Sequence, residues 1–500
     1  MTTLWEEQSP KSRLRDSQWT WLALVVLPIA ALFALLVGQG VWWLALALLL
    51  LIPGFILLHR RPLWALSAWI VVAPFIVTVE AGGLGRKGYW LIHRALPVIA
   101  LAVFVIGGRI GVHRRRLPRL GGPEFLMAGY LVASLISVWY TSLDPLANTY
   151  RVYDWIFIPM CFYLLVRLVE PDERDMSRLM PALAFLVVSQ TLIGVLQWVE
   201  PGILPDPWLG RAGTRTTGSL QHPNAYAVSL LFAGVLLLHA GGVLRRIPRW
   251  VAASLFLVSA TMVMFTFSRA AWLAGAVVIV GLAILQPKLI RRVAAVAIPV
   301  FLILAATGVL SVAGQIAGSR LSSEETALSR LPVALASVRM VEERPIFGWG
   351  YENFDRFDRQ FQSSVLNLVV PEKDHASHNL YLTILAEQGL VGFALYLGPA
   401  LWWLVLTPSA LRHMPTSGFF SRRTLISLWL VALAFVTVSN FANMRVVFAV
   451  TLWWVLLGLI GSIVARFRPT RNWAGREVSP EQRPLRDILI DKTGGLENES

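Results

Sequence analysis

Cysteine and charged side chains are both scarce in this sequence. The chain of 500 residues contains 1 Cys, and 15% of its residues are Asp, Glu, Lys or Arg. Cys161 lies within an apolar run, so the sequence predicts no disulfide framework. Soluble globular domains carry about 25% charged residues. The shortage of charge therefore excludes an ordinary soluble protein with a hydrated surface.

Apolar residues take the place of the missing charges. Hydrophobic residues make up 56% of the chain, which includes 21 Trp. Apolar runs of roughly 17 to 25 residues, the length that a helix needs to cross a bilayer, recur between Trp19 and Phe467. We count about 14 such runs, with an error of about two. They lie near 19–37, 41–58, 63–79, 95–111, 125–141, 155–169, 179–199, 223–243, 250–267, 270–286, 293–313, 379–406, 424–440 and 446–465. The sequence thus predicts an all-α, polytopic bundle of about 12 to 14 transmembrane helices.

The basic residues indicate how these helices cross the membrane. Alternate connecting loops carry clusters of arginine, such as Arg114, Arg115, Arg116 and Arg119. By the positive-inside rule, these loops and both termini are cytoplasmic. We attribute the net charge of +15 mostly to this topology, and we predict no nucleic-acid partner.

The same pattern divides the chain into segments. They are a cytoplasmic N-terminus over 1–18, transmembrane helices over 19–310, one long outward-facing loop over 311–377, C-terminal transmembrane helices over 378–466 and a disordered cytoplasmic tail over 467–500.

The loop over 311–377 is far longer than the other connections, and such length is typical of a functional segment. Apolar residues at helical spacing over 324–343, with Arg330 among them, predict an amphipathic helix near the membrane interface. Pro345 and a Gly-Trp-Gly turn at 348–350 would end this helix. The alternative is a solvated cover over the ends of the spans.

A set of arginines lies on the outward side, against the positive-inside bias. The set consists of Arg86, Arg94, Arg151, Arg211, Arg215, Arg269 and Arg445. Arg269, in TFSRAAWLAG, has apolar neighbours on both sides, so its guanidinium needs a counter-ion, a carbonyl or water. Guanidinium groups suit bidentate phosphate binding. The alternative for each arginine is snorkelling or a structural ion pair, with Glu80, Asp144 or Asp154 as partners.

A second polar cluster precedes a predicted helix in RAGTRTTGSLQHPNAYA, residues 211–227. Pro223 can occupy the first turn of that helix, and His222 or Asn224 would lie at its opening. Helix N-terminal amides together with Arg215 would form an anion site. The alternative is ordinary N-capping, with the arginines in solvent.

A third cluster, HASHNLYLTILAEQGLVG over 375–392, places two histidines at the start of an apolar helix. His378 or Asn379 begins the helix, where an imidazole can meet both water and an amphiphilic substrate. Glu387 lies nine positions beyond His378 and so on the opposite face; we expect it to pair with another element unless the helix breaks at Gly389. The two histidines lack a third ligand of suitable spacing, so we predict no metal site.

These three clusters, together with the loop sequence SRLPVALASVRMVEERPIFGWGYENF, resemble the O-antigen ligase and O-antigen polymerase superfamily of bacterial envelope enzymes. The resemblance is specific from about Arg211 to Gly392 and includes the order of the clusters. The essential arginines of the family correspond to Arg215 and Arg269, and its essential histidine corresponds to His378.

This resemblance implies a multi-pass glycosyltransferase of the GT-C type in the bacterial inner membrane. Its active site would lie on the periplasmic face, and it would use neither a metal nor another cofactor. The implied donor is a glycan on undecaprenyl pyrophosphate, and the other implied partner is a glycan or lipid acceptor within the membrane.

The reaction accounts for these residue types. The departing pyrophosphate gains charge, and no Asp-x-Asp pair for a divalent ion lies on the outer face. We expect Arg215 and Arg269 to supply cationic donors in a poorly hydrated site. We expect His378 to act as general base toward a sugar hydroxyl, contributing about 10²- to 10⁴-fold, with inversion at the anomeric carbon.

Further residues are candidates for substrate binding. They are Arg86, Arg151, Arg211, His222, Asn224, Arg330, His375 and Asn379. For Asn379, helix capping is an alternative at least as good.

The acceptor stays open at this point. A ligase would use lipid A-core as the acceptor, a polymerase would use a second lipid-linked glycan, and a protein-glycosylating branch would use a pilin. The compact SHNLYL and SRAAW segments favour a ligase. The alternative from another class is a transporter for lipid-linked sugars, which would carry ionisable residues deep in its spans and often paired repeats. Here the polar clusters lie at one face and no internal repeat is visible. A scaffold would not need arginines on the disfavoured side.

Overall fold

The computed structural model describes residues 38, 54–76, 87–109, 117–209, 215–244, 247–306, 311, 314–315, 318, 330–362, 377–471 and 477–478. The chain forms two compact units, Met1–Arg61 and Pro62–Ser500. The described part of the first unit is mainly the helix Gly54–Arg60.

Several predicted segments lie largely outside the described residues. They are the N-terminus over 1–18, the first two apolar runs near 19–37 and 41–58, and most of the tail over 467–500. The description below concerns the second unit.

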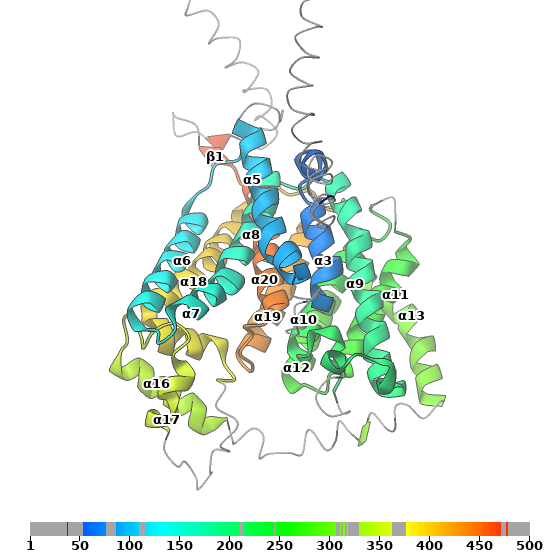
Figure 1. Cartoon of the computed structure of the whole chain (residues 1–500). Helices are drawn as coiled ribbons and strands as arrows, with labels where there is room; N and C mark the ends of the chain where they lie inside the picture. Colours follow the sequence, from blue (N-terminus) through cyan, green and yellow to red (C-terminus); the bar gives the residue numbers. More distant parts are fainter. Residues whose placement is uncertain are drawn as a thin grey trace, which may run out of the picture. The chain divides into compact units, whose positions relative to one another are not determined.

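The second unit is built from α-helices (Figure 1). In chain order, they are α3 (Trp64–Ile76), α5 (Leu96–Arg109), α6 (Gly122–Thr141), α7 (Pro145–Val152), α8 (Ile158–Val169), α9 (Glu173–Val199), α10 (Pro223–Ala240), α11 (Arg249–Met264), α12 (Arg269–Leu285), α13 (Pro287–Ala306), α16 (Leu331–Glu343), α17 (Phe354–Phe361), α18 (Leu380–His413), α19 (Arg422–Ser439) and α20 (Val447–Phe467).

Shorter elements lie between these helices. They are the π-helical segments η1 (Tyr89–Ala95) and η2 (Tyr153–Phe157) and the 3-10 turns η3 (Pro201–Ile203), η4 (Asp206–Trp208) and η5 (Gly218–Leu220). Among the described residues, strands are limited to the antiparallel two-residue pair β1 (Thr470–Arg471) and β2 (Glu477–Val478). The all-α prediction is confirmed.

Eight helices in the described part of the chain are long and apolar enough to cross a membrane. They are Tyr89–Gly108, Gly122–Thr141, Pro145–Val169, Glu173–Val199, Pro223–Ala240, Leu380–His413, Arg422–Ser439 and Val447–Phe467. Each coincides with a run that the sequence predicts as a span, so the chain is a polytopic helical membrane protein. A ninth span results if Gly54–Arg60 and Trp64–Ile76 are counted as one broken helix, and α11 and α12 are shorter apolar helices.

The run predicted near 155–169 is the second half of a longer helix, Pro145–Val169. Polar residues such as Asn148 and Arg151 occupy the first turns of that helix. A hydropathy pattern therefore detects only its apolar end.

The centre of the unit contains α20, with α8 and α10 beside it. Nearly every side chain of α10 and α20 is buried, because both sequences are apolar on all sides. Trp69 of α3 stacks on Phe448 of α20, with ring centroids 4.7 Å apart. In Figure 1, α6 and α18 lie on one side of α20, and α9, α11 and α13 lie on the other.

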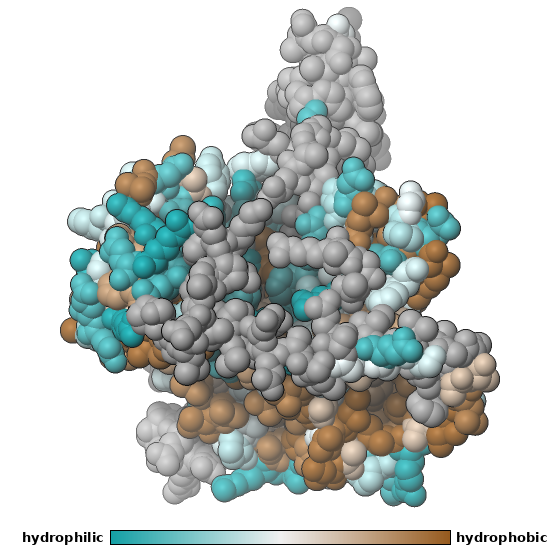
Figure 2. Space-filling view, turned by 90° about the horizontal axis from the view of Figure 1, so that it is seen from below, coloured by the Kyte–Doolittle hydropathy of each residue, from teal (hydrophilic) through white to brown (hydrophobic). Residues whose placement is uncertain are grey.

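The outer surface of the helices is strongly apolar. Large hydrophobic side chains such as Phe125, Ile284 and Val405 are 75%, 73% and 76% exposed. Figure 2, seen from the end of the bundle that carries α16 and α17, shows broad hydrophobic areas beside hydrophilic ones. Such large exposed apolar areas are expected where helices contact lipid.

Helix α18 is broken at Gly389, which has φ +62° and ψ −164°. The segment 345–350 pairs with the backbone groups that the break leaves available: Trp349 N donates to the Ala386 carbonyl at 2.9 Å. In return, Leu390 N donates to the Pro345 carbonyl at 2.8 Å. A Cβ on Gly389 would lie 2.3 Å from the backbone of this segment. The break therefore requires glycine, and it anchors the long loop in a membrane helix.

The described part of the long loop, 330–362, is folded against α18. Helices α16 and α17 enclose a small hydrophobic cluster, whose buried members are Val333, Met340, Trp349, Phe354 and Ala386. The Trp349 indole also donates to the Met340 carbonyl at 2.9 Å. The amphipathic helix predicted over 324–343 is confirmed for Leu331–Glu343, and its earlier part lies outside the described residues. The part of the loop over 330–362 is therefore packed into the protein and is not a loose cover.

Candidate active site

A cavity of about 470 Å³ lies where the starts of α10, α12, α16 and α18 meet. We call it the arginine cavity. Its polar lining includes Arg215, Asn224, Arg269, Arg330, His378 and Asn379, all of them residues that the sequence predicts for catalysis or substrate binding. Its apolar lining includes Phe267, Leu273, Leu331 and Phe441. One ligand with an anionic part and a hydrophobic part can thus be held here.

Arg215 is fixed beside Arg269 by the residue that follows it. Thr216 N donates to the Phe265 carbonyl at 3.1 Å, in the turn between α11 and α12. The Trp198 indole of α9 donates to Thr216 Oγ1 at 2.8 Å. The loop after Arg215 is therefore bound to the turn before Arg269, which explains why both arginines line one cavity.

Arg269 is the first residue of α12. The hydroxyl of the N-cap residue, Ser268, donates to Oδ1 of Asn224 at 2.5 Å and so joins the start of α12 to the start of α10. His222 caps α10, because its Nδ1 accepts from Ala225 N at 3.3 Å. The predicted helix opening, with proline in the first turn, is confirmed. Two helix N-termini, each with a partial positive charge, thus lie at the cavity.

His378 immediately precedes α18. Asn379 is the N-cap of this helix: its Oδ1 accepts from Tyr381 N at 2.9 Å and from Leu382 N at 3.0 Å. The capping interpretation of Asn379 is therefore confirmed. The Ser377 hydroxyl donates to the Asn379 carbonyl at 3.1 Å. These bonds fix the turn that presents His378 to the cavity.

Arg330 brings the long loop to the same place. It precedes α16, and its Nη1 donates to the Phe441 carbonyl at 3.4 Å, between α19 and α20. The cavity wall therefore combines the long loop with the last helical hairpin.

A comparison with known protein families bears on this region. Residues 252–397 match the family model Wzy_C, described as O-antigen ligase. This match supports the resemblance to the O-antigen ligase superfamily over that part of the chain. No curated protein matches the chain.

The matched segment, residues 252–397, runs from α11 to α18 and contains Arg269, Arg330 and His378. Arg215 precedes the matched segment but lines the cavity with these residues. The family match and the helical architecture together support a membrane enzyme of the O-antigen ligase or polymerase type.

A second cavity of about 480 Å³ adjoins the arginine cavity. We call it the polar cavity. The two cavities share lining residues, namely Arg215, Asn224, Arg330, Ser377, His378 and Phe441. The polar cavity extends further, to His222, Glu352, Glu387 and Arg445. His378 and Arg215 therefore lie on the boundary between two compartments.

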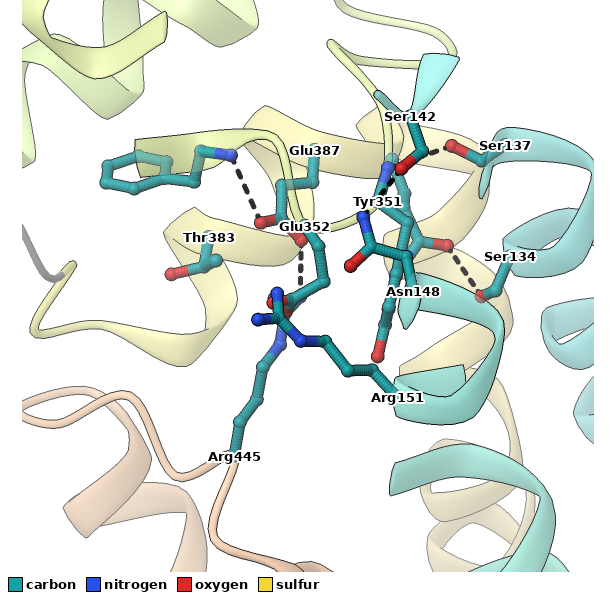
Figure 3. A network of polar contacts seen from close by, with 12 residues as sticks. Ser134, Ser137, Ser142, Asn148, Arg151, Tyr351, Glu352, Thr383, Glu387 and Arg445 are labelled. Carbon is teal, nitrogen blue, oxygen red and sulfur yellow. Dashed lines mark hydrogen bonds and ion pairs between the residues drawn. The ribbon is translucent and has the colours of Figure 1, made fainter. Parts of the chain in front are cut away.

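A charged network that the sequence does not predict as a unit borders the polar cavity (Figure 3). Arg445 donates to carboxylate oxygens of both Glu352 and Glu387. Arg151 Nη1 donates to Glu352 Oε2 at 2.7 Å, and Phe354 N donates to Glu387 Oε1 at 3.3 Å. The network joins the long loop, α7, α18 and the connection between α19 and α20. Two features of the sequence point to this network. Arg445 is among the arginines predicted on the side that the positive-inside rule disfavours, and Glu387 is a carboxylate inside an apolar helix.

Glu387 pairs with another element, as expected, although the helix also breaks at Gly389. Glu387 and His378 nevertheless both line the polar cavity. His378 lies before the N-cap and so does not follow the periodicity of the helix.

Arg445 is a fixed positive charge. Burial of its guanidinium lowers the pKa, but the charges of Glu387 and Glu352 outweigh this effect and raise the pKa well above its ordinary value. Burial also raises the pKa of Tyr351 well above its ordinary value, and Arg445 Cζ lies 5.0 Å from the centroid of that ring. Neither side chain is suited to exchange protons with a substrate near neutral pH.

Two other arginines of the set that the sequence predicts on the outward side have structural partners. Arg94 forms a bidentate pair with Asp154, with Nε–Oδ1 at 2.7 Å and Nη2–Oδ2 at 2.6 Å. The ion-pair alternative therefore applies to Arg94. Arg151 pairs with Glu352 and does not line either of the two cavities described here. The remaining predicted site residues, Arg86, Arg211 and His375, lie outside the described residues.

Within the residues that the structure describes, no group of three or more His, Cys, Asp or Glu side chains could hold a metal ion. The positive charge at the arginine cavity is supplied by guanidinium groups and helix starts. This arrangement suits the binding of a phosphate-bearing ligand.

Proposed function

We propose that this protein is an inner-membrane glycosyltransferase that moves an O-antigen glycan from undecaprenyl pyrophosphate to a lipid A-core acceptor on the periplasmic side. The observation that carries the proposal is the meeting of Arg215, Arg269 and His378, from three separate segments, in one cavity. The family match supports a ligase or polymerase as the class of enzyme.

The arginines act on the leaving group. As the anomeric C–O bond breaks, negative charge grows on the pyrophosphate, and Arg215 and Arg269 stabilise that charge with preorganised N–H donors. The starts of α10 and α12 add partial positive charge at the same place. No metal is required for this stabilisation.

The histidine acts on the acceptor. The imidazole of His378 takes the proton of the attacking sugar hydroxyl, while the hydroxyl oxygen bonds to the anomeric carbon opposite the departing pyrophosphate. The configuration at that carbon is inverted. The position of His378 on the boundary between the two cavities supports this role, because the acceptor can reach it from the polar cavity while the pyrophosphate occupies the arginine cavity.

The apolar lining suits the lipid part of the donor. Leu273 and Phe441 line the arginine cavity and are each 47% exposed. Isoprenoid units next to the pyrophosphate could pack on these side chains while the arginines hold the phosphates.

The test is a transfer assay with purified protein in lipid vesicles. The vesicles contain an undecaprenyl-pyrophosphate glycan, with or without lipid A-core. We expect glycan to become attached to lipid A-core and no product without it. Chain lengthening in the absence of lipid A-core would show a polymerase and contradict the ligase proposal. Movement of intact donor across the vesicle membrane without transfer would instead show a transporter.

A further inference from the structure

The two cavities differ in the charge of their linings. Among the described residues, the arginine cavity is lined by three cationic side chains, Arg215, Arg269 and Arg330, and by no carboxylate. The polar cavity is lined by three arginines and three carboxylates, namely Arg215, Arg330, Arg445, Glu352, Asp355 and Glu387. An anion is therefore favoured in the first cavity, and an uncharged ligand is suited to the second.

The charges of the polar cavity are largely satisfied within the protein. Arg445 bridges Glu352 and Glu387, and Arg151 adds a second cation to Glu352 (Figure 3). Two arginines and two glutamates thus form a balanced network that is bound to the long loop. Such a network fixes the wall of the cavity and offers little net attraction for a second phosphate.

The rest of the polar lining offers hydrogen-bonding groups to a neutral ligand. Gln221 and Asn443 can each donate and accept, Asp355 can accept from hydroxyl groups, and the Thr383 hydroxyl can do both. Trp155 adds an aromatic ring to the lining. Many donors and acceptors around a neutral space are typical of a site for a hydroxyl-rich molecule.

We propose that the polar cavity is a carbohydrate subsite. It holds the sugar unit next to the bond that is made or broken, while the arginine cavity holds the pyrophosphate. This inference rests on the proposed glycosyltransferase function. A volume of about 480 Å³ is within the range of small-molecule sites, roughly 300 to 1,000 Å³. Because His378 and Arg215 border both cavities, a sugar in the polar cavity would lie beside both the base and the leaving group.

The sugar could belong to the donor or to the acceptor, and kinetics can distinguish them. We suggest three variants of the polar cavity, Asp355→Asn, Thr383→Val and Gln221→Asn. The last keeps a residue type that tolerates the left-handed backbone found there, with φ +57°. Asp206→Asn is the matched control, because Asp206 is an exposed carboxylate outside both cavities.

The measurement is the KM for donor and for acceptor in the vesicle assay, with correct folding checked by thermal unfolding of each variant. A lost hydrogen bond to a charged group corresponds to about a 10-fold loss of affinity. We therefore expect Asp355→Asn to raise one of the two KM values about 10-fold, with smaller rises for the other two variants. A raised acceptor KM assigns the cavity to the acceptor sugar, and a raised donor KM assigns it to the donor sugar. The control should match the wild type.

Wild-type transfer together with unchanged KM values in all three folded variants would overturn the subsite. A loss of kcat in these variants without any change in either KM would also overturn it, because it would show a positioning role and not a binding role. Failure of the wild-type protein to transfer glycan would contradict the proposed function instead. Binding of the free glycan, cut from its lipid, gives a readout without turnover: the wild type should bind it more tightly than Asp355→Asn.

Discussion

At the residue scale, Arg269 should act through the fork of its guanidinium and not through charge alone. Arg269→Lys keeps the charge but removes the paired N–H donors. We expect kcat to fall about 10- to 100-fold, the range that corresponds to losing one or two charge-assisted hydrogen bonds. The measurement is initial-rate kinetics in the vesicle assay.

The control for this variant is Arg178→Lys, at a half-exposed arginine that pairs with Asp175 three residues away in α9. It should leave kcat unchanged, since such surface pairs contribute about 0 to 1 kcal/mol. Wild-type kinetics in Arg269→Lys would contradict a bidentate role for Arg269.

Residue roles could be predicted where they depend on local sequence. His222 and Asn379 lie at helix openings as expected, because capping is decided by a few neighbouring residues. The pairing of Arg445 with Glu352 and Glu387 could not be predicted, because the three residues meet only through tertiary structure. Nor could the sequence show that Arg94 pairs with Asp154 while Arg215 and Arg269 line a cavity.

At the element scale, the break in α18 should tolerate no side chain at residue 389. Gly389→Ala adds a Cβ within 2.3 Å of the backbone of the segment 345–350, at a positive φ. The conformational cost alone is about 1 to 3 kcal/mol, because this combination of φ and ψ is essentially restricted to glycine, and the contact adds to it. We expect a lower melting temperature or loss of folded protein, measured by thermal unfolding in detergent.

Gly202→Ala is the matched control, because its nearest contact would be 3.8 Å from the new Cβ. It should unfold like the wild type. If Gly389→Ala also unfolds like the wild type, then the docking of the long loop on α18 does not depend on the break.

The charged network should stabilise the same junction. Arg445 and Glu387 have side chains that are 10% and 2% exposed. Arg445→Gln leaves two carboxylates without their shared cation, so we expect a loss of about 3 to 5 kcal/mol in the free energy of unfolding. The double variant Arg445→Gln with Glu387→Gln should recover part of this loss, because one uncompensated charge is removed.

Chemical unfolding of the single and double variants checks this prediction. Arg178→Gln, at the half-exposed pair in α9, should change stability by less than about 1 kcal/mol. A stability of Arg445→Gln equal to that of the wild type would show that the network does not hold the long loop.

Elements could be predicted where apolar periodicity is strong. The eight described spans follow the hydropathy of the sequence because lipid requires continuous apolar helices. The start of the helix Pro145–Val169 was missed because its first turns are polar and approach the long loop through Arg151. The docking of the segment 345–350 depends on backbone hydrogen bonds, and these leave no pattern in side chains beyond the glycines.

At the scale of the whole molecule, the helices and the long loop combine to enclose two adjoining cavities with His378 on their boundary. The membrane character and the resemblance to the O-antigen ligase superfamily could be inferred from the sequence, because composition indicates the first and local clusters indicate the second. The division into an arginine cavity and a polar cavity could not, because each lining draws on at least four segments.

In the proposed mechanism, arginines and one histidine perform glycosyl transfer without a metal. The most direct test compares wild type and His378→Ala in vesicles that contain donor, lipid A-core and EDTA, with donor binding measured on the same samples. His413→Ala, at an exposed histidine near the end of α18, is the control. We expect EDTA to leave wild-type transfer intact, and His378→Ala to lose about 10²- to 10⁴-fold in rate while still binding donor. Loss of wild-type transfer in EDTA, or full transfer by His378→Ala, would contradict this mechanism.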